Sequence, residues 1–255
     1  MAKKGQFARA HAYSTNTLSA VLSEADREEG FTAHIAAVKP PVWRLGSKQA
    51  VDSAIERYMG EPAPVRLKGG KVAYRKRRKD HRCLTAGVLT WPDPTADFTA
   101  NNPLLKIKFQ GWLDKTQRWL DEKYGENLVA VCLHTDESHP HIHFFVVGDA
   151  QRLHPGLRAE LVNDKRIDDP DTRMKAHVAG LKSWLNDYHE SVAQHFGMER
   201  TLNARPAWRI QDRATREKLF QIDKQLKAVP NADIQAQRDQ VWDEEYKTDR
   251  PEMRF

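Results

Sequence analysis

The stretch LVAVCLHTDESHPHIHFFVV, residues 128–147, decides the fold that we expect for this chain. It contains two apolar runs, Leu128–His134 and His141–Val147, joined by a six-residue polar link. Short apolar runs of this kind are typical of buried strands, and so short a link favours antiparallel pairing. The sequence therefore predicts an antiparallel pair of strands.

Further strands and helices are expected on both sides of this pair. Residues 6–14 and 83–91 have the alternation or the β-branched and apolar content of strands, and the adjacent prolines in residues 39–43 exclude a regular helix there. Helices are expected where apolar residues recur at helical spacing, in residues 18–29, 48–59, 109–125 and 181–197. Strands and helices mixed without strict βαβ alternation predict an α+β fold with a central antiparallel sheet.

Length and composition limit the class of protein. The chain has 255 residues, of which 40% are hydrophobic, enough for a real core, and no apolar run approaches the length of a membrane span. Its two cysteines, Cys83 and Cys132, lie too far apart in sequence for a disulfide framework or a thiolate zinc site. We therefore expect a soluble, cytoplasmic protein in which any metal is bound by His, Asp or Glu.

The composition changes near the end of the chain. From about residue 214 it shifts to Lys, Gln, Asp and Glu around a helical stripe of apolar residues. This change predicts a main domain in residues 1–212 and a helical extension in residues 213–255, which is a candidate site for a protein partner.

The positive charge of the chain is concentrated in one segment. The chain carries a net charge of +6, whereas residues 66–82 alone carry +8, so the other residues sum to −2. Such a segment favours an exposed loop or hairpin that binds DNA through its phosphates, with one ring available to stack on a base. The candidate DNA-binding residues are Arg66, Lys68, Lys71, Tyr74, Arg75, Lys76, Arg77, Arg78, Lys79 and Arg82.

Four of the eleven histidines lie within ten residues, at His134, His139, His141 and His143. Alternation along a strand places His141 and His143 on one face, and His134 at the end of the neighbouring strand can complete a three-nitrogen site. His139 precedes the turn at Pro140 and is expected to point away. Three neutral imidazoles beside two acidic residues predict a divalent metal site, whereas a lone His-x-His would favour surface histidines.

The pattern His134-x-Asp136-Glu137-x-x-Pro140-His141-x-His143 resembles the third motif of the Mob/Pre plasmid mobilisation and recombination relaxases, a branch of the HUH endonucleases. Residues 115–131 and 181–200 are similar to the elements that flank this motif in the family. The resemblance covers roughly residues 6–200 and implies a five-stranded antiparallel sheet flanked by helices. It also implies that the three histidines bind Mn²⁺ or Mg²⁺ and that Glu137 helps to activate a nucleophile.

The sequence departs from the family at the nucleophile. Mob/Pre relaxases characteristically have a histidine three residues before an arginine, and with that arginine aligned on Arg27 the histidine is replaced by Glu24. A carboxylate is a poor covalent nucleophile here because an acyl phosphate hydrolyses readily. Arg27 remains a candidate for binding the scissile phosphate through its guanidinium fork. The alternative nucleophiles are His34, Tyr13 and His11 in the N-terminal region and Tyr188 on the late helix.

The resemblance implies a metal-dependent endonuclease and transesterase that nicks one DNA strand at an origin of transfer in plasmid mobilisation, or conjugation. Its expected partner is single-stranded or hairpin DNA at a plasmid origin. One alternative is an origin-binding protein that keeps the relaxase fold but has lost covalent nicking, and another is a rolling-circle replication initiator. A metal-dependent hydrolase of a small substrate would leave the basic segment unexplained.

Overall fold

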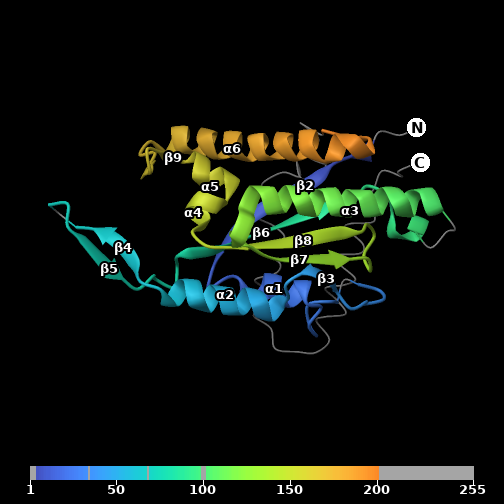
Figure 1. Cartoon of the computed structure of the whole chain (residues 1–255), viewed down its shortest axis with the longest axis horizontal. Helices are drawn as coiled ribbons and strands as arrows, with labels where there is room; N and C mark the ends of the chain where they lie inside the picture. The colour runs from blue at the N-terminus through green and yellow to red at the C-terminus, as the bar shows by residue number, and fades with distance from the viewer. Residues whose placement is uncertain (1–3, 34, 68, 99–101, 201–255) are drawn as a thin grey trace, which may run out of the picture. The chain divides into compact units, whose positions relative to one another are not determined.

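The computed structural model describes residues 4–200, apart from residues 34, 68 and 99–101 (Figure 1). The expected helical extension, residues 213–255, and its suggested protein contact lie outside the described residues. His34 and Lys68 lie outside them as well. Within the described ranges, no helix combines the length and the apolar character that crossing a membrane requires.

A five-stranded antiparallel sheet forms the centre of the described chain (Figure 1). Its spatial order is β2 (Phe7–Ser14), β6 (Arg82–Thr90), β8 (His141–Val147), β7 (Leu128–His134) and β3 (Val42–Leu45). The central pair is the one that the polar link predicted, with Leu133 opposite Ile142 and His134 opposite His141. The expected α+β class and five-stranded sheet are confirmed.

Helices cover both faces of the sheet. One core cluster joins it to α3 (Pro103–Tyr124) and α6 (Pro170–Ser191), and the other to α1 (Ser19–Ala25) and α2 (Lys48–Gly60). Along β8, Ile142, Phe144 and Val146 belong to the first cluster, whereas Phe145 and Val147 belong to the second. Because side chains alternate along a strand, the odd-numbered His141 and His143 share the face that α1 and α2 cover.

The helices α3 and α6 begin earlier than their apolar spacing predicts. Asn102 caps α3 by accepting a hydrogen bond from the Leu105 N–H, and Asp169 caps α6 by accepting one from the Thr172 N–H. A proline follows each cap at the first helical turn, where its missing N–H costs nothing. Both helices therefore begin at their caps, ahead of the apolar residues whose spacing predicted them.

Several short elements are absent from the sequence-based expectation. They are β1 (Lys4–Gly5), η1 (Thr95–Phe98), η2 (Gly125–Asn127), α4 (Ala150–Leu153), α5 (Pro155–Ala159), β9 (Leu161–Val162), β10 (Lys165–Arg166), η3 (Ala193–Phe196) and β11 (Met198–Glu199). Elements of two to five residues are too short for an apolar period to be read. The edge strand β3 was anticipated only as a non-helical stretch.

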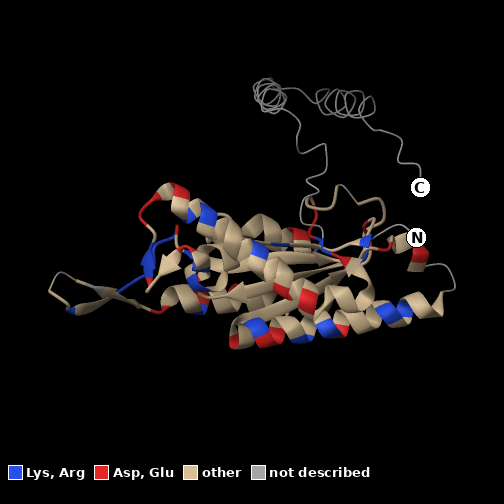
Figure 2. Ribbon diagram, turned by 90° about the horizontal axis from the view of Figure 1, so that it is seen from above, with Lys and Arg blue, Asp and Glu red and all other residues tan. Residues whose placement is uncertain are grey.

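The basic segment begins in a two-stranded ribbon, β4 (Ala63–Arg66) and β5 (Val72–Arg75). This ribbon extends away from the body of the molecule in both views (Figures 1 and 2). Gly69 and Gly70 at its tip have φ angles of 85° and 80°, which glycine adopts without steric cost. The hairpin that we expected for this segment is therefore present.

Candidate metal centre and its pocket

The three predicted metal ligands meet at one end of the central strand pair. His134 ends β7, and the first and third residues of β8 are His141 and His143. One ligand nitrogen from each ring can be chosen so that all three lie within 4.8 Å of one another, and all three residues are buried. His139 does not belong to this group; it is half-buried, and its ring forms a hydrogen bond with the Ser138 hydroxyl.

We call His134, His141 and His143 the triad. In two of these residues one ring nitrogen is bonded to a backbone carbonyl, which leaves the other ring nitrogen free. His134 Nε2 lies 2.9 Å from the carbonyl oxygen of Ala25 and donates to it, and His141 Nδ1 donates to the carbonyl of His139 at 3.0 Å. These bonds leave His134 Nδ1 and His141 Nε2 with lone pairs. In the described part of the chain, His134 Nδ1 and His143 Nε2 have no hydrogen-bond partner.

The environment favours the neutral form of the His143 and His134 rings. Burial, followed by the effect of neighbouring positive groups, lowers the pKa of His143 well below its usual value. Burial also lowers the pKa of His134 to about 4, although its hydrogen bond to Ala25 opposes the shift. Neutral imidazole is the form that binds a metal. Without a metal, buried polar nitrogens that have no partner lower the stability of the folded state. The triad therefore fits a divalent ion.

Arg27 ties the polar link to the end of α1. Its Nε and Nη2 donate to the two carboxylate oxygens of Asp136 at 3.0 and 2.6 Å, and Nη2 also donates to Glu137 Oε1 at 2.9 Å. Only 2% of the Arg27 side chain is exposed. The backbone N–H of Lys39 also donates to Asp136.

These contacts differ from the expected role of Arg27 at the scissile phosphate. Its guanidinium fork is directed at two protein carboxylates and is therefore already engaged within the protein. The Oε1 atom of Glu137 lies 3.6 Å from His141 Nε2, which places this carboxylate beside the triad. Spacing in the sequence could not reveal the Arg27 contacts because they join residues more than 100 positions apart.

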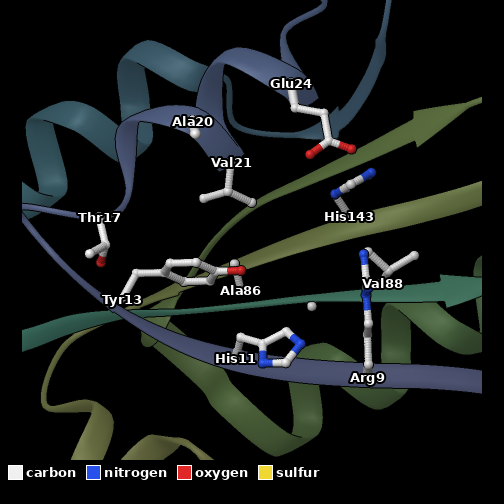
Figure 3. A pocket seen from close by; sticks show the side chains of 11 residues that line it. Arg9, His11, Tyr13, Thr17, Ala20, Val21, Glu24, Ala86, Val88 and His143 are labelled. Carbon is white, nitrogen blue, oxygen red and sulfur yellow. The ribbon is translucent and has the colours of Figure 1, made fainter. Parts of the chain in front are cut away.

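A pocket of about 220 Å³ lies beside the triad (Figure 3). Its lining comes from β2, α1, the turn between them, β6 and β8, and consists of Arg9, His11, Tyr13, Thr17, Ala20, Val21, Glu24, Ala86, Gly87, Val88 and His143. Figure 3 shows the Glu24 carboxylate directed towards His143, and the Tyr13 ring extending into the pocket. His143 is therefore shared by the pocket and the triad.

The pocket contains two of the four alternative nucleophiles that the sequence offered, Tyr13 and His11. Tyr13 is half-buried on β2, and burial raises the pKa of its hydroxyl. Arg9 and His11 precede it at two-residue intervals, so all three point to one face of the strand. Arg9 was not among the predicted site residues, although the alternation in residues 6–14 places it on the same strand face as Tyr13.

Tyr188 has a different environment. It is fully buried in the core between α3 and α6, where its hydroxyl accepts a hydrogen bond from Trp112 Nε1 at 2.9 Å. Burial raises the pKa of this hydroxyl as well. A DNA strand cannot reach Tyr188 without opening the core, so this placement argues against its suggested role as a nucleophile.

Two of the predicted DNA-binding residues are used within the protein. The Arg77 guanidinium lies 3.9 Å from the centre of the Tyr58 ring, and it donates hydrogen bonds to the carbonyl oxygens of Tyr58 and Glu61. Arg78 is paired with Asp80. The structure thus gives Arg77 an anchoring role at the base of the ribbon, while Lys71, Tyr74, Arg75, Lys76, Lys79 and Arg82 remain exposed.

Comparison with known proteins identifies a family. The Mob_Pre model, described as plasmid recombination enzyme, matches residues 66–203. Among solved structures, the MobM relaxase domain (MOBV; Mob_Pre) bound to a 26-nucleotide oriT DNA of pMV158 is 19% identical, covering 79% of this chain and 94% of its own, with a TM-score of 0.43.

A Mn-bound crystal structure of the same domain with a 22-nucleotide oriT DNA at pH 4.6 is 18% identical, covering 77% of this chain and 89% of its own, with a TM-score of 0.46. No curated protein sequence matches significantly. The family model spans more than half of the 255 residues. The chain therefore belongs to the Mob_Pre family of plasmid recombination enzymes.

Proposed function

We propose that this protein is a metal-dependent relaxase that nicks one DNA strand at an origin of transfer during plasmid mobilisation, with Tyr13 as the attacking group. The observation that carries the proposal is the junction at His143. This residue belongs both to a buried triad with free ring nitrogens and to a pocket that contains the Tyr13 hydroxyl.

The triad suits Mn²⁺ or Mg²⁺. A divalent ion held by these nitrogens would supply Lewis-acid polarisation of the scissile phosphate. The MobM relaxase domain, which belongs to the same family, is Mn-bound in its crystal structures. The Ala25 and His139 carbonyls fix the ring orientations of His134 and His141, as outer partners of metal ligands commonly do.

Residues of the pocket have roles in the proposed step. The Tyr13 oxygen forms a bond to phosphorus, the bond from phosphorus to the 3′ oxygen breaks, and the 3′ oxygen takes a proton from water and leaves as a hydroxyl. The Tyr13 proton passes to Glu24 or His11, which line the same pocket. Arg9 is the exposed cation of that lining, and we assign it, rather than Arg27, to the phosphate charge.

The role of Tyr13 is tested by adduct formation. Wild-type protein with Mn²⁺ and a suicide oligonucleotide carrying the origin should form a covalent protein–DNA product. Tyr13→Phe should abolish this product, while Tyr188→Phe and His34→Ala should retain it. An adduct that survives Tyr13→Phe would show that another residue attacks.

The replacement of the family histidine by Glu24 favours one competing function. A protein that binds origin DNA without cutting it would need the metal and the basic surface but no nucleophile. DNA binding by the wild type with no covalent product would support this alternative. The burial of Tyr188 removes the main reason for considering a rolling-circle initiator.

A further inference from the structure

Glu24 brings a carboxylate to the junction between the pocket and the triad. This residue lies on α1 and lines the same pocket as His143, and Figure 3 shows its carboxylate directed towards that ring. Burial and, to a smaller extent, the charge of Glu24 raise the pKa of the Tyr13 hydroxyl, so these two side chains lie near each other. A negative charge is therefore directed at the edge of the triad.

This carboxylate has no cation to pair with among the described residues. Glu24 is half-buried, yet it takes part in none of the ion pairs of the described chain. Arg27 contacts only the backbone carbonyl of Glu24, and Arg9 lines the pocket without forming an ion pair. A carboxylate that is partly removed from water is unfavourable without a counter-charge.

The triad has the complementary need. Within the described ranges, His134 Nδ1 and His143 Nε2 are buried nitrogens without a hydrogen-bond partner. Neutral imidazoles carry no charge, so a divalent ion held by them alone would keep its full charge of +2 in a buried site. One carboxylate ligand would lower the net charge to +1 and with it the cost of burial.

Glu137 is the other carboxylate beside the triad, but it is already engaged. Its Oε1 accepts a hydrogen bond from Arg27 Nη2 at 2.9 Å and lies 3.6 Å from His141 Nε2. Its charge is therefore shared with a buried arginine, whereas the charge of Glu24 is not. Of these two carboxylates, Glu24 is the one whose side chain is free to turn towards an ion.

We propose that Glu24 is the fourth protein ligand of the divalent ion, adding a carboxylate oxygen to the three imidazole nitrogens. This inference rests on the proposed function, which requires the ion. The atoms that lie within 4.8 Å of one another come from the triad alone, so the Glu24 side chain rotates towards the ion when the ion binds. His11 then remains in the pocket to accept the Tyr13 proton.

A carboxylate ligand would determine which metal the site prefers. Imidazole suits Zn²⁺, Ni²⁺ and Cu²⁺, whereas carboxylate oxygens suit Mg²⁺ and Mn²⁺. The triad alone is therefore a ligand set for the first group, and Glu24 shifts its preference towards the second. Mn²⁺ and Mg²⁺ also favour six ligands, so four protein ligands leave two positions for water or phosphate oxygens.

The first test measures metal preference by calorimetry on the full-length chain, with Mn²⁺ and Ni²⁺ as separate probes. Glu24→Gln should weaken Mn²⁺ binding at least tenfold, because a direct ligand should matter at least as much as the outer partners of metal ligands. The same variant should weaken Ni²⁺ binding less. Glu29→Gln is the matched control, since it removes an exposed carboxylate just beyond α1, and it should leave both affinities unchanged.

The second test separates direct ligation from an effect of charge at a distance. Electron paramagnetic resonance of bound Mn²⁺ in ¹⁷O-labelled water counts the water molecules on the ion. Glu24→Ala should add one water, because it vacates one coordination position. Glu137→Gln should leave this number unchanged, since Arg27 holds that carboxylate in the wild type.

The outcomes distinguish this inference from the proposed function. Equal Mn²⁺ affinity in Glu24→Gln and wild type, or an unchanged number of waters in Glu24→Ala, would overturn the ligand assignment. The relaxase proposal would then stand with Glu24 as a proton acceptor. Wild-type protein that binds no Mn²⁺ would contradict both proposals. Circular dichroism of each variant checks that a loss of metal binding is not a loss of fold.

Discussion

The metal centre and the ribbon handle polar groups in opposite ways. In the metal centre the charged and polar atoms are buried and fixed by contacts between distant segments, such as Arg27 with Asp136 and Glu137. In the ribbon the cations lie in water and belong to one continuous segment.

This difference shows that the buried metal centre and the exposed ribbon meet different physical requirements for binding a ligand. A buried centre needs its geometry in place before the ligand arrives, because unpaired charge in the interior is costly. An exposed ribbon needs only charge and shape, because water solvates its cations until a ligand displaces that water. Substitutions in the metal centre should therefore strongly reduce metal binding or stability. Substitutions in the ribbon should change stability little, and their effects should depend on salt concentration.

The largest effect is expected for the metal ligands. His141→Ala should remove measurable Mn²⁺ binding in calorimetry, because one of three ligand nitrogens is lost. His139→Ala is the matched control, since this half-buried histidine lies in the same link outside the triad and its backbone carbonyl is retained. Equal Mn²⁺ affinity for His141→Ala and wild type would contradict the metal assignment.

The next effect concerns buried and exposed arginines. Arg27→Ala should lower the free energy of unfolding by about 3–5 kcal/mol, because Asp136 would be left buried without its partner. Arg78→Ala removes an exposed ion pair with Asp80 at the base of the basic segment and should cost less than about 1 kcal/mol.

Urea unfolding at neutral pH measures both changes. A similar cost for the two arginines would show that burial does not make the Arg27 ion pairs more important for stability than the exposed pair of Arg78 in the basic segment.

A smaller effect is expected in acid, and it concerns the body of the protein. Burial lowers the pKa of His154 to about 4, although its hydrogen bond to the Ala10 carbonyl opposes the shift. The unfolded chain then binds more protons than the folded chain between about pH 4 and 6.5, so stability falls as pH decreases through this window.

His154 should account for about 2 kcal/mol of the stability lost between pH 7 and 5. His154→Gln should remove that part of the loss, as measured by urea unfolding at the two pH values. An unchanged difference between pH 7 and 5 in the variant would exclude His154 as a source of acid sensitivity.

Much of the fold and the placement of the metal-site histidines on the central strand pair follow from local sequence patterns. The two apolar runs around the polar link predicted the central strand pair, and alternation within the second run predicted that His141 and His143 share a face. The concentration of charge in residues 66–82 likewise indicated an exposed loop or hairpin, and part of this segment lies in the β4–β5 hairpin. These features depend on residues close together in the chain, whose relative positions the backbone period fixes.

Only the tertiary structure decided which distant groups meet. The same sequence patterns allowed Arg27 to bind phosphate and Tyr188 to attack it, but packing pairs Arg27 with two carboxylates and encloses Tyr188 beside Trp112. It also brings Tyr13 on β2 into the pocket lined by His143 on β8. Such contacts depend on how strands are ordered and helices cover them, and a local period carries no information about partners more than 70 residues away.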